Sequence, residues 1–82
     1  MMSINIFKFL MKQNKAILKL VKKYGSITEL ANQIGVSRTY VGHWLHGRRP
    51  IPVDLVKKLA LLSEGELKRK DFRPDIFDDE NI

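Results

Sequence analysis

Residues 27–45 read ITELANQIGVSRTYVGHWL, a pattern that predicts two short helices joined by a tight turn. In the first half, the apolar residues that follow the i, i+3, i+4, i+7 spacing of one helix face are Ile27, Leu30, Ala31 and Ile34. Ser26 and Glu29 fit an S-x-x-E capping box, in which each side chain satisfies a free backbone N–H, so this helix should begin near Ile27. Gly35 can take the left-handed conformation that ends a helix at little cost, which predicts the turn.

The second helix is predicted over residues 37–46, with one apolar and one polar face. Ser37 can cap its start, and Gly47 is placed to end it. Because successive helical residues are about 100° apart, Val41 and Trp44 should turn inward, with Tyr40 at the margin between the two faces. Leu45 also belongs to the inward face. The outward face is polar and small, and it comprises Arg38, Thr39, Gly42, His43 and His46.

This outward face has the chemistry expected for reading base edges in double-stranded DNA. Arg38 can donate two hydrogen bonds to guanine O6 and N7, Thr39 offers a hydroxyl and a methyl group, and His43 can donate or accept. A glycine inside a helix costs roughly 0.5–1 kcal/mol relative to alanine. We therefore expect Gly42 to let the helix backbone approach the groove closely. Base readout is assigned to Arg38, Thr39, Gly42 and His43.

The residues that follow the second helix, Arg48-Arg49-Pro50-Ile51-Pro52, predict a rigid basic loop. Arg48 and Arg49 are expected to hold phosphates, and the alternative is exposed loop charge without a partner. Tyr40 could pack its ring while its hydroxyl reaches a phosphate. The expected phosphate contacts are Ser37, Tyr40, His46, Arg48 and Arg49.

The two-helix pattern resembles the helix-turn-helix of Cro-type repressors. Ala31 stands where the two helices would touch, Gly35 lies in the turn with Val36 after it, and Val41 and Trp44 face inward, as in that family. Residues 25–77, with GVSRTYVGHWLHGRRPIP and the later FRPDIF, resemble the YdaS-like branch, found among prophage and antitoxin-like genes. Lys68 stands where that branch usually has threonine or serine. The resemblance implies a lambda-repressor-like domain that binds DNA and regulates transcription.

Further helices are predicted on both sides of this unit. Helix 1 should run from about residue 13 to residue 23, and a fourth helix should start with Pro52 at its first position and end at Gly65. A short basic segment over residues 67–71 precedes Phe72, whose ring should close the core. The fold class is therefore all-α, a compact bundle of four to five short helices within one domain over residues 12–77.

Charge is distributed unevenly along the chain. The formal net charge is +6, but residues 1–50 hold nine Lys and Arg against the single acid Glu29. Residues 78–82 are read as an acidic tail, because they contain Asp78, Asp79 and Glu80. Basic charge on phosphates releases counterions and gives sequence-independent affinity for nucleic acid. The alternative is a solvated basic surface that keeps the protein soluble.

Residues 1–11 are too apolar for a loose tail, and both period 2 and period 3.6 fit them in part. Three interpretations stay open for this N-terminal extension. It could extend helix 1 backward or pack on the domain, or it could form a self-association surface. Met11 could also be the true start, which would leave the extension with little functional weight.

Other functional classes find little support in the sequence. No Gly-rich phosphate loop, nucleophile elbow or zinc signature is present, so we expect neither an enzyme nor a cofactor. His43 and His46 lie at i, i+3 without a third ligand nearby, so no metal site is expected. The chain has no cysteine, no apolar run long enough for a membrane span and no recognisable signal peptide, which fits a cytoplasmic protein.

These observations predict a DNA-binding repressor that acts as a homodimer on a pseudo-palindromic operator, with double-stranded DNA as its partner. One rival is an antitoxin-like interaction module that binds a toxin or another protein partner and autoregulates through DNA. The other rival is a binder of RNA or single-stranded DNA, which predicts an aromatic ring such as Trp44 exposed beside basic residues.

Overall fold

The computed structural model describes the backbone of residues 2–77 and the side chains of residues 12–77. Five helices follow one another along this part of the chain: α1 (Met2–Tyr24), α2 (Ile27–Ile34), α3 (Arg38–Leu45), α4 (Val53–Leu62) and α5 (Arg69–Phe72). The all-α fold class is confirmed. The acidic tail lies outside the described residues, so its expected role stays a prediction.

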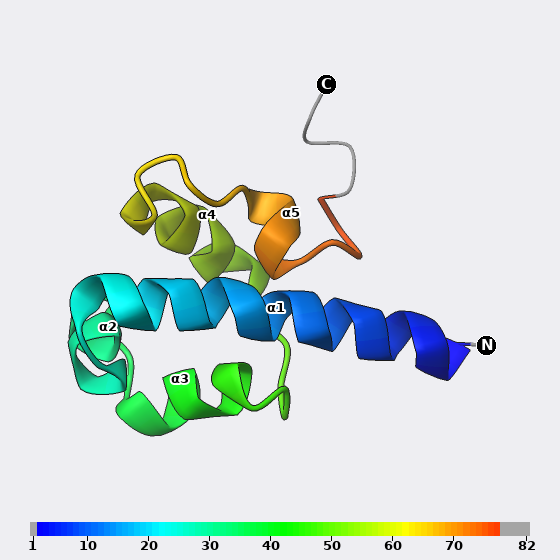
Figure 1. The fold of residues 1–82 in the computed structure, drawn as a ribbon, viewed down its shortest axis with the longest axis horizontal. Coiled ribbons are helices and arrows are strands. Elements are labelled where there is room, and N and C mark those ends of the chain that lie inside the picture. Colours follow the sequence, from blue (N-terminus) through cyan, green and yellow to red (C-terminus); the bar gives the residue numbers. More distant parts are fainter. Residues whose placement is uncertain (1, 78–82) are drawn as a thin grey trace.

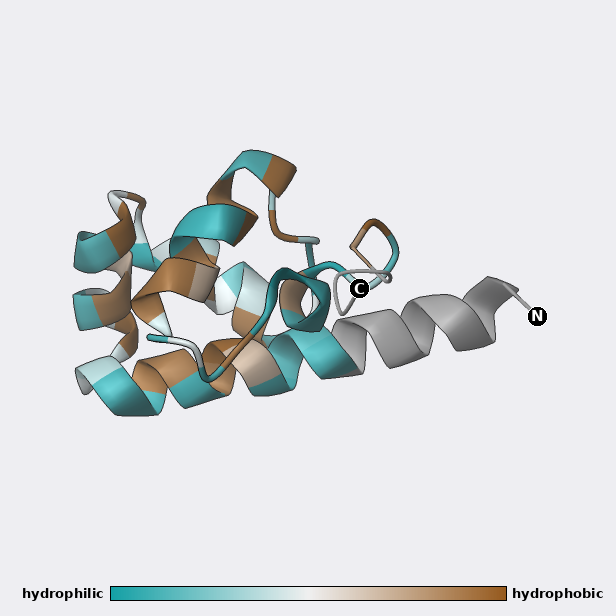
Figure 2. Ribbon diagram, turned by 90° about the horizontal axis from the view of Figure 1, so that it is seen from above, coloured by the Kyte–Doolittle hydropathy of each residue, from teal (hydrophilic) through white to brown (hydrophobic). Residues whose placement is uncertain are grey.

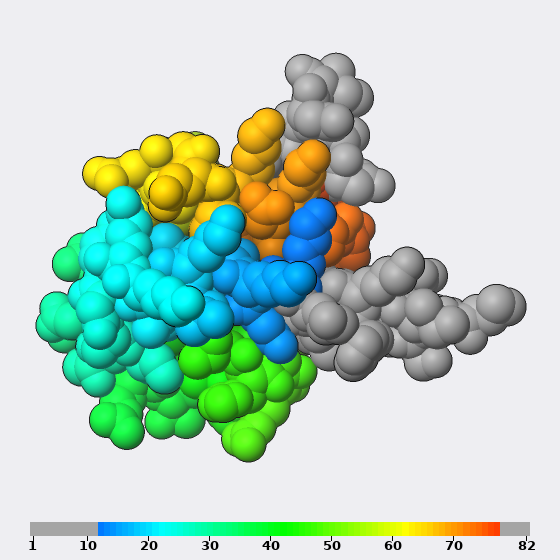
Figure 3. All heavy atoms as spheres, in the orientation of Figure 1, coloured from blue at the N-terminus to red at the C-terminus, as the bar shows by residue number. Residues whose placement is uncertain are grey.

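The long helix α1 crosses the molecule between two groups of shorter helices (Figure 1). On one side of α1 lies α3, and on the other lie α4 and α5. The space-filling view in the same orientation shows α1 across the middle, with the green residues around α3 below it and the yellow to orange residues of the C-terminal half above (Figure 3). α3 packs against both α1 and α2, whereas α5 packs against α1 and α4. α3 and the C-terminal helices therefore occupy different sides of the domain.

The core is a single cluster to which every helix contributes. Both hydrophobic and hydrophilic residues occur along each short helix, as expected for helices with one buried face (Figure 2). Trp44 and Phe72 are the largest side chains that are fully buried, which confirms the predicted positions of both rings. The remaining core residues are Ala16, Ile17, Leu20, Leu30, Ala31, Ile34, Val41, Ile51, Val56, Leu59 and Leu67.

The turn between α2 and α3 forms as its sequence predicts. The Ser26 hydroxyl accepts a hydrogen bond from the Glu29 N–H at 3.1 Å and so caps the start of α2. Gly35 has φ +91°, in the left-handed region, and its N–H donates to the Ala31 carbonyl at 2.8 Å. The Lys58 ammonium donates to the Ile34 carbonyl at 2.9 Å, so α4 satisfies the end of α2.

The bounds of α1 and α4 differ from the expected ones. α1 begins at Met2 rather than near residue 13, so the backbone of the N-terminal extension continues the helix. Pro52 has an extended backbone (φ −57°, ψ 140°) and is the residue before the first turn of α4, not the first residue within it.

The end of α4 also corrects the prediction, because the helix stops at Leu62 and not at Gly65. The Tyr24 hydroxyl donates to the Leu62 carbonyl at 2.9 Å, and the buried Ser63 hydroxyl accepts from the Leu67 N–H at 3.0 Å. These two contacts satisfy backbone groups that a longer helix would have paired. Gly65 then lies in the following turn, where it has φ +90°.

The C-terminal segment is tied back to the domain by Arg73. Its guanidinium donates to the Ile51 carbonyl at 2.7 Å and to both carboxylate oxygens of Asp75, at 3.0 and 2.8 Å. The α5 turn has no threonine or serine cap. Instead the Asp71 carboxylate accepts from the Lys68 N–H at 2.9 Å and satisfies the start of this turn.

The Arg73–Asp75 pair predicts a dependence of stability on pH. Hydrogen bonds from Arg73 hold the pKa of the Asp75 carboxyl below its usual range. The stabilisation is therefore fully present above the unfolded-state pKa of about 4 and is lost as the pH falls through the depressed folded-state pKa. Because the Asp75 side chain is 44% exposed, the effect should stay below about 1 kcal/mol.

Urea unfolding of the wild type and of Asp75→Asn at pH 7, 4 and 2.5 measures this contribution. The wild type should be more stable at pH 7, and the difference should shrink toward zero at the lowest pH. A difference that stays constant over the three pH values would show that ionisation of Asp75 does not stabilise the fold.

Candidate nucleic-acid interface

α3 is fixed so that its polar face points outward. The Ser37 hydroxyl accepts from the Tyr40 N–H at 3.2 Å and caps the helix. Val41 and Trp44 on the inner face are fully buried, and they pack into the core beside α1 and α2. Rotation of α3 about its axis would expose the indole ring, so the core determines which side chains reach solvent.

An open groove runs along the outer face of α3. The eight residues that line it come from the starts of α2 and α3, the length of α3 and the loop after it: Ile27, Thr28, Arg38, Thr39, Gly42, His43, His46 and Arg48. All four residues assigned to base readout from the sequence are among them. The structure therefore brings Arg38, Thr39, Gly42 and His43 together on one surface.

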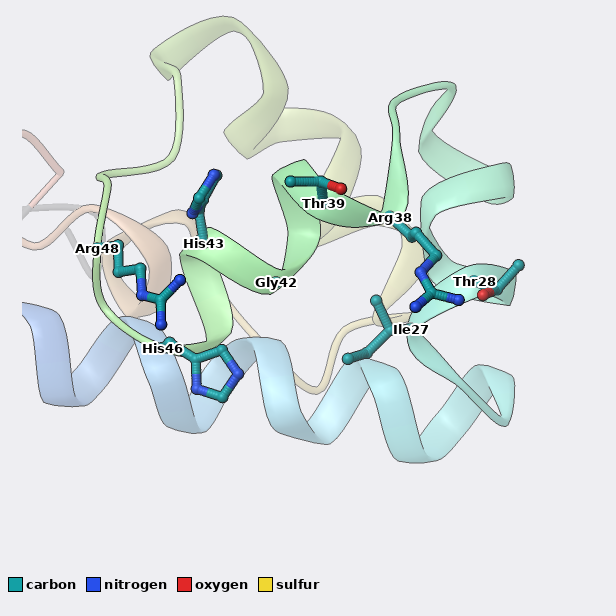
Figure 4. A pocket seen from close by; sticks show the side chains of 8 residues that line it. All are labelled: Ile27, Thr28, Arg38, Thr39, Gly42, His43, His46 and Arg48. Carbon is teal, nitrogen blue, oxygen red and sulfur yellow. The ribbon is translucent and has the colours of Figure 1, made fainter.

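The side chains are arranged along the axis of α3 (Figure 4). The Arg38 guanidinium lies at one end, next to Ile27 and Thr28 of α2, and Arg48 and His46 lie at the other end. Gly42 is in the middle of the helix. A Cβ atom built on Gly42 would have no heavy atom within 4 Å, so the space in front of it is open. The groove thus has a basic group at each end, and between them lie Thr39, His43 and the bare backbone of Gly42.

The five residues assigned to phosphate contacts are not all at the same place. His46 and Arg48 line the groove, and both are exposed. Ser37, Tyr40 and Arg49 are also exposed but do not line it. The Ser37 oxygen already accepts the capping hydrogen bond, and its own hydroxyl hydrogen is still available to donate.

Tyr40 lies at the edge of the outward face, as its phase predicts. Its side chain is 41% exposed, and its ring is tilted against that of Trp44 with 5.6 Å between the ring centroids. Trp44 itself is fully buried and is not accessible to a base. This burial counts against the RNA or single-stranded DNA interpretation, which predicts that the Trp44 ring is exposed.

Three residues of this region were not predicted to belong to the site. Ile27 and Thr28 line the groove because the start of α2 lies beside Arg38. Predicting this contact from the sequence would require the angle between α2 and α3. Gln13 is fully buried, and its amide contacts the end of α3 and the loop after it. The sequence does contain one indication that Gln13 is buried: it lies three positions before Ala16, on the apolar face of α1.

The charges in this region favour an anionic ligand. No acidic residue lines the groove, and the basic side chains Arg38 and Arg48 do. Among the side chains of residues 12–77, no group of three His, Asp or Glu could hold a metal ion. In the same part of the chain, no helix combines the length and hydropathy that crossing a bilayer needs.

Comparisons with known proteins agree with this geometry. The model of the bacterial toxin YdaS family matches residues 17–81. The regulatory protein cro of Pseudomonas phage D3 is 29% identical over 56 residues, which are 68% of this chain and 77% of that protein. No solved structure matches the chain at a significant level. The chain therefore belongs to the YdaS family and is a Cro-like helix-turn-helix regulator.

Proposed function

We propose that this regulator is a sequence-specific repressor that binds double-stranded DNA as a homodimer on a pseudo-palindromic operator. The observation that carries the proposal is the open groove along α3, with Arg38 at one end and Arg48 at the other. A helix presented in this way fits the major groove of B-form DNA, which is about 12 Å wide.

In this proposal the outward face of α3 reads base edges. Arg38 donates to guanine O6 and N7, Thr39 contacts a base through its hydroxyl or methyl group, and His43 donates or accepts. Gly42 lets the α3 backbone approach the bases, because no side chain stands between them. Thr28 adds a hydroxyl from α2 at the Arg38 end.

The phosphate contacts hold the register of α3 in the groove. Arg48 and Arg49 supply two guanidinium groups, and Ser37, Tyr40 and His46 supply further hydrogen-bond donors. Because these residues flank α3 at both ends, the proposed contacts would lie on both strands that border the major groove. They add affinity for every sequence and do not select among bases.

A homodimer follows from the short reach of α3. Eight helical residues extend about 12 Å, which is the length of three to four base pairs. Too few bases can be read by one such helix to give a specific site in a genome. Two copies related by a two-fold axis would double the contacts, with half-sites about 34 Å apart. The similarity to the regulatory protein cro of Pseudomonas phage D3 supports a regulatory role for this chain.

Selection of binding sites from random duplex DNA at a stated salt concentration tests the function. A palindromic motif with half-site centres about 10–11 base pairs apart is expected. Sedimentation of the complex on that motif should give two chains per duplex. Binding without any enriched motif would contradict sequence-specific repression and favour the interaction module instead.

Replacement of single arginines should separate base readout from phosphate contact. Arg38→Ala should cost about 1–3 kcal/mol on the selected site and relax the preference at one base pair. Arg48→Ala should weaken binding to all duplexes and reduce the slope of log K against log salt by about 0.9. Titrations of both variants on specific and random duplexes give these values. Equal losses on the two duplexes for both variants would rule out the assigned roles.

The role of Gly42 predicts opposite effects on stability and on binding. Gly42→Ala should stabilise the free protein by about 0.5–1 kcal/mol, since alanine is the better helix former and the added methyl group meets open space. The same methyl group should weaken DNA binding, because it occupies the closest approach to the bases.

Asn32→Ala is the matched control, since Asn32 is an exposed helical residue of α2 outside the groove. It should raise helix propensity and leave DNA affinity unchanged. Thermal unfolding and operator titrations measure both variants. If Gly42→Ala binds the operator as tightly as the wild type, close approach at this position is excluded.

A further inference from the structure

Among the described residues of α1, only Gln13 has a side chain that hydrogen-bonds both to α3 and to the basic loop of residues 48–52. Its amide nitrogen donates to the Trp44 carbonyl at 3.2 Å and to the Arg49 carbonyl at 2.9 Å. Its amide oxygen accepts from the Ile51 N–H at 3.1 Å. The side chain is fully buried, so water does not compete for these bonds. Every hydrogen bond of this amide therefore goes to the chain segment that ends α3 and follows it.

The pairing of Gln13 with the loop imitates that of a neighbouring β-strand. In an extended segment, the carbonyl of one residue and the N–H of the residue two positions later point to the same side. Arg49 and Ile51 have this spacing, and the Gln13 amide meets both groups at once. Pro50 between them has no N–H to offer. The loop thus obtains from a side chain the backbone pairing that it cannot make with itself.

These bonds restrain the loop that carries the two arginines. In the sequence, Arg48 and Arg49 lie between the Trp44 carbonyl and the Ile51 N–H, and Gln13 binds both of these groups. An apolar side chain of the same length would fill the space but leave the Arg49 carbonyl and the Ile51 N–H without partners. The Trp44 carbonyl would keep its bond from the Gly47 N–H, at 3.2 Å. The loop would then move toward water and carry its arginines away from the end of α3.

We propose that Gln13 is the positioning residue for the phosphate contacts, which sets where Arg48 and Arg49 lie relative to the polar face of α3. This inference rests on the proposed function, since it assigns those arginines to phosphates. Gln13 itself touches no ligand. Its removal should therefore reduce the salt dependence of binding while the preference among bases is retained.

Gln13→Met gives the first test, because methionine matches the length of glutamine and forms no such hydrogen bonds. Operator and random duplexes should both be bound at least about fivefold more weakly. The slope of log K against log salt should fall by about 0.9 for each phosphate that is no longer bound, and by about 1.8 if both arginines are displaced. The ratio of operator to random binding should change by less than about twofold.

Gln13→Glu gives a second test, in which the pH dependence of DNA affinity is measured. A simple loss of packing would not change this pH dependence. A neutral carboxyl group can donate to the Arg49 carbonyl and accept from the Ile51 N–H, whereas a carboxylate can only accept. Burial should raise the pKa of the introduced carboxyl, so this group should be neutral at about pH 5.5 and increasingly ionised as the pH is raised to about 9. Affinity should lie within about threefold of wild type at the lower pH and at least about tenfold below it at the higher pH.

Other charged groups near position 13 could also change the affinity with pH, and the control variants account for their effect. The end of α3 and the loop carry His46, Arg48 and Arg49, and Arg73 donates to the Ile51 carbonyl. The helix α5, which packs against α1, carries Arg69, Lys70 and Asp71. The wild type and Gln13→Met carry all of them. The relevant quantity is therefore the affinity of each variant divided by that of the wild type at the same pH and salt concentration.

The outcomes separate this inference from the proposed function. A folded Gln13→Met variant with an unchanged salt slope would overturn the positioning role, and so would a Gln13→Glu ratio that is the same at both pH values. If Gln13→Met does not fold, the test is the affinity of Gln13→Glu relative to the wild type at the two pH values. Failure of Gln13→Glu to fold at the lower pH would also overturn the positioning role. Absence of salt-dependent duplex binding by the wild type would refute the proposed function instead.

Discussion

Burial of the Trp44 indole is the constraint on which the geometry of the interface depends. Because Trp44 and Val41 occupy the core, the rotation of α3 about its own axis is fixed, and with it the direction of every side chain on the opposite face. The same indole supports the ring of Tyr40 at the edge of that face. Arg38 and His43 need no internal partner to be held in place, since the helix that carries them cannot turn.

Satisfaction of helix ends by distant side chains holds the small domain together. Lys58 caps the last turn of α2, and Tyr24 caps the last turn of α4. Each bond joins helices that lie far apart in the sequence. In a domain of this size the apolar core is limited, and such bonds add directionality that apolar contacts lack. They restrict the ways in which short helices of similar shape can pack.

Local signals were sufficient to predict the helix-turn-helix and most of the groove. The caps at Ser26 and Ser37, the left-handed Gly35 and the phase of Trp44 all depend on residues within a few positions of one another. The end of α4 was missed because its cap comes from Tyr24, 38 residues away. Gln13 was missed for the same reason, since its partners lie 31 to 38 residues further along the chain. The start of α1 stayed undecided because the apolar pattern there fits two periods.

Ile51 is held on both sides, since its N–H is bound by Gln13 and its carbonyl by Arg73. One anchor comes from the first helix and the other from the segment after the last. During synthesis the chain emerges from the ribosome in sequence order, so the residues of α3 emerge before the second anchor. The loop that carries Arg48 and Arg49 can reach its final position only when nearly the whole described chain has emerged. Nascent or C-terminally truncated chains that lack Arg73 would then have a loop with only one of its two restraints.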